Sequence, residues 1–220
     1  QSAAEHFQSG ESNVGQPGSF TCTRRPLAQF VEAVTLLNAS TSEHGETVSV
    51  EYDLVKRAVA LGLGLIDPRA PYGTELFDAL CRVTVSVAIE AVCLRLNAGH
   101  DVEVLLIQRR ADDSAYPGEW HCPGSALRPG ESYDDVFARL SRGEFWAEVR
   151  SKRFLEDFNH PKEERGHFES KIYLCDVAPG AKGTWFPISA LPEKTVAHHR
   201  DHIIPVALEA FRARLRHDQW

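Results

Sequence analysis

The sequence has no pair of cysteines at the CxxC spacing of a zinc knuckle. Its cysteines are five scattered residues, Cys22, Cys81, Cys93, Cys122 and Cys175. An odd, scattered set indicates neither a structural zinc site nor a disulfide framework. We therefore expect reduced, buried thiols in a cytoplasmic protein.

Runs of basic residues and long apolar stretches are also missing. Lys and Arg number 24 against 31 Asp and Glu, which gives a formal net charge of -7, so the electrostatic footprint of a nucleic-acid binder is absent. The longest apolar run, Val83 to Val92, is interrupted by Ser86 and Glu90 and is shorter than the roughly 20 residues that cross a bilayer. The N-terminus lacks a secretory pattern. We expect neither a nucleic-acid nor a membrane partner.

What is present is enough for a folded domain. The 220 residues are 43% apolar and 25% charged, which fits one generous domain, or one domain with a small partner. Residues 1–20 are polar and predict a disordered tail. Apolar spacings of three and four residues predict helices over 25–37 and 51–63, so residues 21–80 are expected to form a helical N-terminal extension and residues 81–220 the main domain.

The periodicity changes after Arg82. Alternation from Val83 to Ile89 predicts a strand, and the Asn97–Asp101 turn between two apolar runs predicts a hairpin. The remaining segments that we expect to be regular are a helix over 132–140, strands over 171–177 and 185–187, and a helix over 204–216. This order predicts a mixed α/β or α+β domain.

One segment carries a pattern that suggests chemistry. Trp120–Glu131 contains a glycine loop that ends in a carboxylate, and a helix with Arg139 and Glu144 follows. The segment resembles the Nudix box, in which a glycine is followed after five residues by Glu and after seven more by Arg-Glu-aliphatic-x-Glu-Glu-x-Gly-aliphatic. Ser125 stands at the second glycine of the usual pair, and Glu131 and Arg139 follow at the family spacing.

The surroundings of this segment resemble the same family. Val104–Arg109 is similar to the strand before a Nudix box, Pro117–Trp120 to the turn that enters it, and Phe158–His167 to a later family stretch. The likeness extends over residues 83–216. It implies an α+β, Nudix-like α/β/α sandwich preceded by the helical extension.

The helix departs from the family pattern. Leu140 and Gly143 replace two glutamates, Trp146 stands where Gly is usual, and Glu144 is retained. GDP-mannose mannosyl hydrolases are similar, with Arg-Leu-x-x-Ala-Glu at these positions. That resemblance implies one Mg²⁺, or Mn²⁺ in its place, held by the Gly124 carbonyl and Glu144, a hard-oxygen set that suits such an ion.

The resemblance also implies roles for further residues. Glu144, Arg139, Glu131 and Arg109 are the expected catalytic group, with the arginines balancing the diphosphate charge, and Arg109, Trp120 and Ser125 are expected to bind substrate. For Glu131 and Arg139 we favour a plainer interpretation, a salt bridge that fixes the loop to the helix. Aromatic residues such as Tyr116, Trp120 and Phe168 stack on a nucleobase or, more commonly, pack in a core.

The general base is left open. In the similar hydrolases it is a histidine in the loop before the last sheet strand, but residues 178–184 contain none. The remaining candidates are Glu163, Glu164, His198, His199 and His202. His198 and His202 also have the i, i+4 spacing of metal ligands, with no third ligand evident.

Three functions follow as hypotheses. The first is a Mg²⁺-dependent hydrolase of a nucleoside diphosphate linked to another moiety, such as a nucleotide sugar or dinucleotide. The alternative is a catalytically impaired Nudix-fold nucleotide-binding sensor or scaffold. The third assigns residues 21–80 a structural role such as dimerisation, so that a homodimer is left open.

Overall fold

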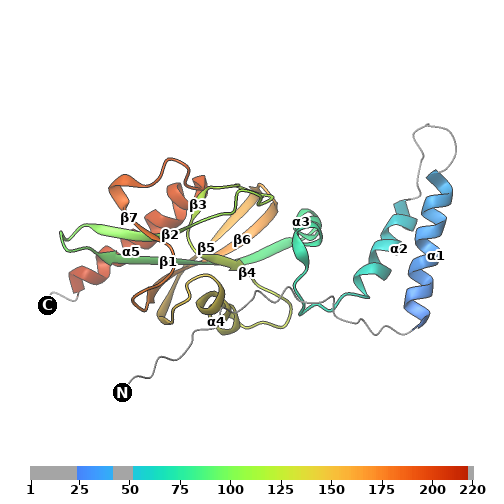
Figure 1. The fold of residues 1–220 in the computed structure, drawn as a ribbon, viewed down its shortest axis with the longest axis horizontal. Coiled ribbons are helices and arrows are strands. Elements are labelled where there is room, and N and C mark those ends of the chain that lie inside the picture. The colour runs from blue at the N-terminus through green and yellow to red at the C-terminus, as the bar shows by residue number, and fades with distance from the viewer. Residues whose placement is uncertain (1–23, 42–51, 218–220) are drawn as a thin grey trace, which may run out of the picture. The chain divides into compact units, whose positions relative to one another are not determined.

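The chain divides into two compact units, with the boundary between Asp67 and Pro68. The computed structural model describes residues 24–41 and 52–217 (Figure 1). The expected tail over 1–20 lies outside these residues. Among the described helices, none combines the length and apolar character needed to cross a bilayer.

The first unit contains the two helices that the apolar spacing predicts. They are α1 (Arg24–Thr41) and α2 (Tyr52–Leu63), and they pack against each other. Small residues allow the approach: Ala33 and Ala58 are buried, and a Cβ on Gly62 would lie 3.2 Å from the Phe30 ring.

The second unit contains a mixed sheet and three α-helices. In chain order its elements are α3 (Gly73–Val83), β1 (Val85–Leu96), β2 (Val102–Gln108), β3 (Trp120–His121), β4 (Gly124–Ala126), α4 (Tyr133–Gly143), β5 (Val149–Glu163), β6 (Gly166–Val177), β7 (Thr184–Pro187), a 3-10 turn η1 (Ile188–Ala190), a π-helical turn η2 (His199–Ile203) and α5 (Ile204–His217). The sheet order is β3-β2-β1-β6-β5, with β4 paired to β1 and β7 to β2. The expected boundary at 80/81 falls inside α3.

Strand β1 is the centre of this sheet. It runs parallel to β6 along Val85–Cys93. On its other edge it pairs first with β4, through residues 88–90, and then with β2, through residues 94–96. Strand β1 starts at Val85, two residues later than the sequence predicts, because Val83 is the last residue of α3.

The predicted hairpin is confirmed. The Asn97 side-chain oxygen accepts hydrogen bonds from the backbone N–H groups of Gly99 and Asp101, both at 2.9 Å, and His100 has a φ of 64°. This closes a tight turn between β1 and β2.

Two apolar cores lie on the two faces of the sheet. Val136, Phe137 and Leu140 of α4 belong to one core, and Ala207 and Phe211 of α5 belong to the other. The helices therefore cover opposite faces (Figure 1), which confirms the expected α/β/α sandwich and the helices expected over 132–140 and 204–216.

Strand β5 was not expected from the sequence. All of its residues are exposed or half-buried, it contains Pro161, and its pairing with β6 has three irregularities. Strand β5 lies at the edge of the sheet and pairs with β6. Because none of its side chains is fully buried, its sequence lacks the regular alternation of apolar and polar residues that predicts a strand.

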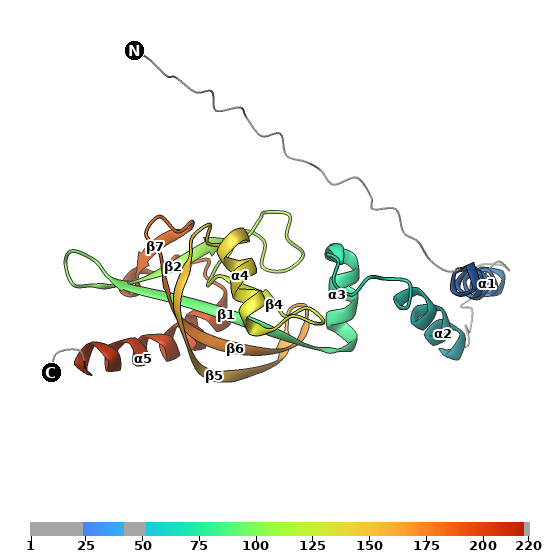
Figure 2. The same cartoon turned by 90° about the horizontal axis from the view of Figure 1, so that it is seen from below.

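Helix α3 packs at the end of the sheet where β1 begins, against the start of β6 (Figure 2). Gly166, which opens β6 with a φ of 151°, lies directly under the Cys81 carbonyl: a Cβ there would fall 2.0 Å from that oxygen. The Arg165 side chain forms an ion pair with Asp78 of α3 at 3.2 Å. Glycine at 166 is therefore required for α3 to dock.

This contact predicts a large effect of Gly166→Ala. We expect a loss of about 2 kcal/mol or more, because the added methyl clashes with backbone. Gly118→Ala is the matched control: Gly118 also has a positive φ, of 73°, but nothing lies within 4 Å of its Cβ position, so the loss should be about 1 kcal/mol. Urea unfolding measures both, and equal losses would contradict the packing described.

Candidate functional site

A cleft of about 590 Å³ lies in the second unit, beside β1 at the stretch paired with β4. Its lining comes from α3, β1, β2, β4 and the β5–β6 turn, and from the segment that enters η2. Residues far apart in the sequence therefore meet around one cavity.

Residues 124–131 form the loop of the Nudix-like segment, here called the box loop. Gly124 lies at its start and packs closely against β1. It is paired with Glu90 of β1, and a Cβ at this position would lie 2.5 Å from Glu90 Oε2 and 2.9 Å from the Ile89 carbonyl oxygen. Only glycine fits here without a shift, so the backbone of the loop lies flat against the central strand.

The salt bridge expected between Glu131 and Arg139 is present. Arg139 Nε and Nη2 donate to Glu131 Oε1 and Oε2 at 2.9 and 2.8 Å, a bidentate geometry. Arg139 also donates to the Ala126 carbonyl at 2.9 Å and to the Ser125 hydroxyl. This guanidinium is occupied by the loop, so the pair holds residues 125–131 on α4.

Helix α4 begins with a capping box between Ser132 and Asp135. Leu140, at a position where the box usually has Glu, is fully buried in the core. Glu144 is the C-cap residue of α4, and it lines the cleft. Trp146 has a φ of 52°, the left-handed conformation that explains the family's glycine at this position.

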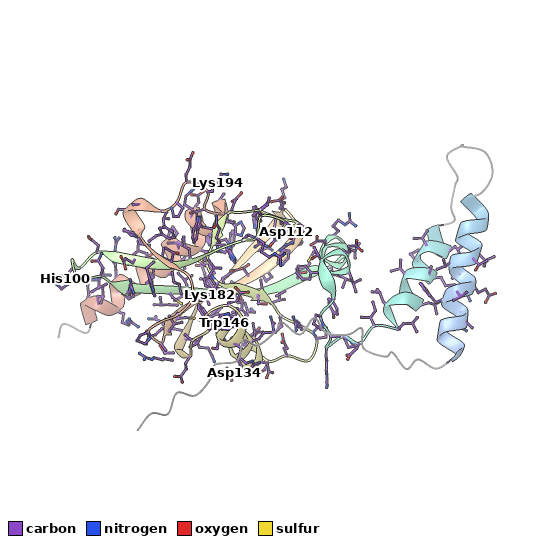
Figure 3. The ribbon with its side chains drawn as sticks, viewed as in Figure 1. His100, Asp112, Asp134, Trp146, Lys182 and Lys194 are labelled. Atoms are coloured by element: carbon purple, nitrogen blue, oxygen red, sulfur yellow. The ribbon has the colours of Figure 1, made fainter. Side chains whose placement is uncertain are left out.

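Positive charge surrounds Glu144. Burial raises its pKa, and the cationic Lys182, Arg109 and Arg139 oppose that rise. Lys182 Nζ lies 5.6 Å from the centre of the Trp146 ring; both residues are labelled in Figure 3. The Glu144 carboxylate is therefore partly desolvated, and the charges that act on it are positive.

Arg109 lines the cleft with a largely buried guanidinium. Its Nη2 pairs with Asp113 at 3.0 Å, and its side chain is 16% exposed. Its Nε is buried with no hydrogen-bond partner. A largely buried guanidinium on the wall of a cleft suits an anionic ligand.

Four histidines gather at the side of the cleft. The ring of His198 lies 4.6 Å from those of both His160 and His199, and the His121 ring lies 6.0 Å from His199. Burial, reinforced by neighbouring positive groups, lowers the pKa values of His121 and His198 to about 4, and it lowers the pKa of His199 well below its usual value. These three rings are neutral at pH 7.

Glu90 faces this cluster from the cleft floor. The Cys122 N–H donates to His199 Nδ1 at 3.2 Å, so neutral His199 carries its proton on Nε2, 4.0 Å from Glu90 Oε2. The Ser170 hydroxyl donates to Glu90 Oε1 at 3.4 Å. Burial raises the pKa of Glu90 to about 8, with Ser170 opposing the rise.

The five candidate bases separate into two groups. Glu163, His198 and His199 line the cleft. Glu164 instead accepts from the Tyr116 N–H at 3.3 Å, and His202 pairs with Glu156 at 2.7 Å; neither contributes to the cleft lining.

The expected substrate-binding residues are also divided. Arg109 and Ser125 line the cleft. Trp120 does not: its ring packs edge-on against Phe186 at 4.9 Å, in the core beneath α5. The cleft instead has Tyr116 and Phe168 among its lining aromatic residues.

Sequence reasoning missed Glu90, His121, Asp113 and Arg165, which the structure places at the cleft. For Glu90 a signal existed, because a carboxylate that interrupts a buried apolar strand is costly unless it has a function or a partner. The others follow no local pattern.

Within residues 24–41 and 52–217, no group of three or more His, Cys, Asp and Glu side chains is arranged to hold a metal ion. The i, i+4 pair His198 and His202 is split, since His202 turns to Glu156. The described part of the chain thus has no preformed metal site made of three or more such side chains.

Comparison with solved structures identifies the architecture. A MutT/Nudix family protein from Listeria innocua superposes with a TM-score of 0.51 at 20% identity, covering 61% of this chain and 97% of that one. The second unit has the Nudix fold. No family model and no curated protein matches the chain.

Two other Nudix structures are similar at lower scores. A MutT/Nudix family protein from Enterococcus faecalis has a TM-score of 0.48 and 21% identity, over 59% of this chain and 63% of that one. The Nudix domain of Shewanella oneidensis NrtR, solved with ADP-ribose, has a TM-score of 0.45 and 19% identity, over 71% and 97%. The chain thus spans under two thirds of the Enterococcus protein. The particular likeness to GDP-mannose mannosyl hydrolases stays a prediction.

The burial of Glu90 predicts a pH-dependent stability difference for Glu90→Gln. The folded protein holds the Glu90 proton up to about pH 8, whereas the unfolded chain releases it near pH 4.5. Wild-type stability therefore falls as pH rises through this window, and the variant lacks this loss. Without divalent metal, we expect equal melting temperatures at pH 4 and a variant higher by about 2–4 °C or more at pH 8. A difference that does not change with pH would show that Glu90 is not buried as described.

Proposed function

We propose that this chain is a divalent-metal-dependent hydrolase of the Nudix type, acting on a nucleoside diphosphate linked to another moiety. One observation carries the proposal. A single cleft on a Nudix fold contains a largely buried arginine, the carboxylate that follows helix α4, and a glycine packed closely on β1, namely Arg109, Glu144 and Gly124.

The residues present fit a hard divalent cation. The expected ligands, the Gly124 carbonyl and the Glu144 carboxylate, are both oxygen donors at the same cleft, which is the ligand type that Mg²⁺ and Mn²⁺ take while retaining water. Burial raises the pKa of Glu144, so a cation beside it would relieve the cost of its charge. A bound metal would supply Lewis-acid stabilisation of the diphosphate.

The chain's own groups divide the remaining work. Arg109 binds the diphosphate from the wall of the cleft, and the low exposure of its side chain strengthens that interaction. Glu131 and Arg139 are positioning residues that hold the loop in register. Glu163, His198 and His199 remain the candidates to take the proton of an attacking water, since they line the cleft.

A nucleotide-binding sensor remains the second candidate, and one feature favours it. Leu140 is fully buried where the family usually has a carboxylate, so α4 cannot present a metal ligand from that position. On this second account, the protein would bind the ligand and turn it over slowly or not at all.

The two candidates are separated by an assay of nucleotide sugars, ADP-ribose and dinucleotides, each with Mg²⁺, Mn²⁺ or EDTA. Metal-dependent release of product from one compound supports the hydrolase and names the substrate class. Thermal stabilisation by one compound, with no turnover of any, supports the sensor.

Glu144→Gln tests the assigned carboxylate. We expect turnover to fall about 10²-fold or more, because loss of a ligand charge weakens the metal that stabilises the diphosphate, while nucleotide binding is retained. Glu148→Gln is the matched control, an exposed glutamate four residues on that does not line the cleft, and it should keep full activity. Unchanged turnover in Glu144→Gln would overturn the assignment.

A further inference from the structure

We infer that helix α3 and the residues just before it form the wall of the cleft that binds the nucleobase of the substrate. This inference rests on the proposed function and deepens it, since it makes the aromatic base, rather than the diphosphate alone, part of what the protein recognises. The segment is more than an extension preceding the domain.

The first support is the position of the segment. Residues 71–74 and Phe77 supply part of the cleft lining, with Tyr72 among them, and Tyr116 and Phe168 line the same cavity. Aromatic faces beside a bound diphosphate give a base a stacking surface, and such stacking is tolerant of base identity. The cleft therefore combines an aromatic region with an anion-binding arginine.

The second support is a chain of alternating charges that joins α3 to that arginine. Asp78 of α3 lies 3.2 Å from Arg165 Nε, Arg165 pairs with Asp113, and Asp113 pairs with Arg109 at 3.0 Å. All four side chains are less than a third exposed. The helix that carries Phe77 and the guanidinium that faces the diphosphate are thus held in one network.

This network is incompletely satisfied. In the described part of the chain, the buried side-chain nitrogens and oxygens without a hydrogen-bond partner are Asp78 Oδ1, Arg109 Nε and Arg165 Nε. Asp78 Oδ1 and Arg165 Nε lie 3.2 Å apart as an ion pair, so of these three atoms Arg109 Nε is the one with no partner of either kind. A buried donor without a partner is costly for stability alone and needs an explanation such as a functional role or a bound ion or water.

The wall is also preformed. The absence of a side chain at Gly166 lets the turn lie directly beneath the Cys81 carbonyl of α3, and the Arg165 guanidinium lies 5.7 Å from the Phe77 ring centre. The position of Phe77 is therefore fixed before a ligand arrives, which lowers the entropic cost of binding.

The test is calorimetric titration of the full chain with ADP and, separately, with inorganic pyrophosphate, both in Mg²⁺. The variants are Phe77→Leu, which removes the ring but keeps apolar volume, and Phe77→Tyr, which keeps the ring. Phe154→Leu is the matched control, because Phe154 packs on Tyr173 outside the cleft lining. Melting temperatures identify any variant that fails to fold.

We expect Phe77→Leu to weaken ADP binding about tenfold or more and to leave pyrophosphate binding unchanged. Phe77→Tyr and Phe154→Leu should bind both compounds as the wild type does. Equal weakening of ADP and pyrophosphate in Phe77→Leu, or no weakening of either, would overturn the inference while leaving the proposed function intact. A wild-type protein that binds neither compound would instead overturn the proposed function, and the inference with it.

Discussion

The site depends on a change of partner along strand β1. Residues 88–90 of this strand pair with the box loop, whereas residues 94–96 pair with β2. The cleft lies beside the β4-paired stretch. Because Gly124 has no side chain, the loop lies close against Glu90, and the Glu131–Arg139 pair then holds the rest of the loop on α4. The spacing of the box residues is thus the distance along the chain between two contacts that fix the loop: Gly124 on β1, and the Glu131–Arg139 pair on α4.

Two kinds of titratable group line the cleft. The charges that act on Glu144 are cationic, from Lys182, Arg109 and Arg139. Burial keeps Glu90 and His199 in their neutral forms at pH 7. The positive charge of Arg109 acts on all three groups, so this arginine connects the two sets. The raised pKa of Glu90 and the lowered pKa of His199 have the same physical cause, which is desolvation beside the central strand.

Local patterns predicted the parts of the molecule that local physics determines. The Asn97–Asp101 turn, the stripe of α4 and the box spacing each follow from residues close in sequence, and the structure confirms them. The edge strand β5 was missed because an exposed strand carries no alternation. The neutral histidines and the Asp78–Arg165–Asp113–Arg109 chain were missed because they come from elements whose meeting only the tertiary fold determines. Trp120 was expected at the site on chemistry alone, and packing against Phe186 places it in the core.

The most direct test is to locate Mn²⁺ by anomalous scattering in crystals grown with a non-hydrolysable nucleoside diphosphate derivative. A retained helix carboxylate and the box glycine predict one peak within coordination distance of the Glu144 carboxylate and the Gly124 carbonyl, with the diphosphate against Arg109. A peak among His121, His198 and His199, or a diphosphate bound away from Arg109, would contradict this assignment of the cleft.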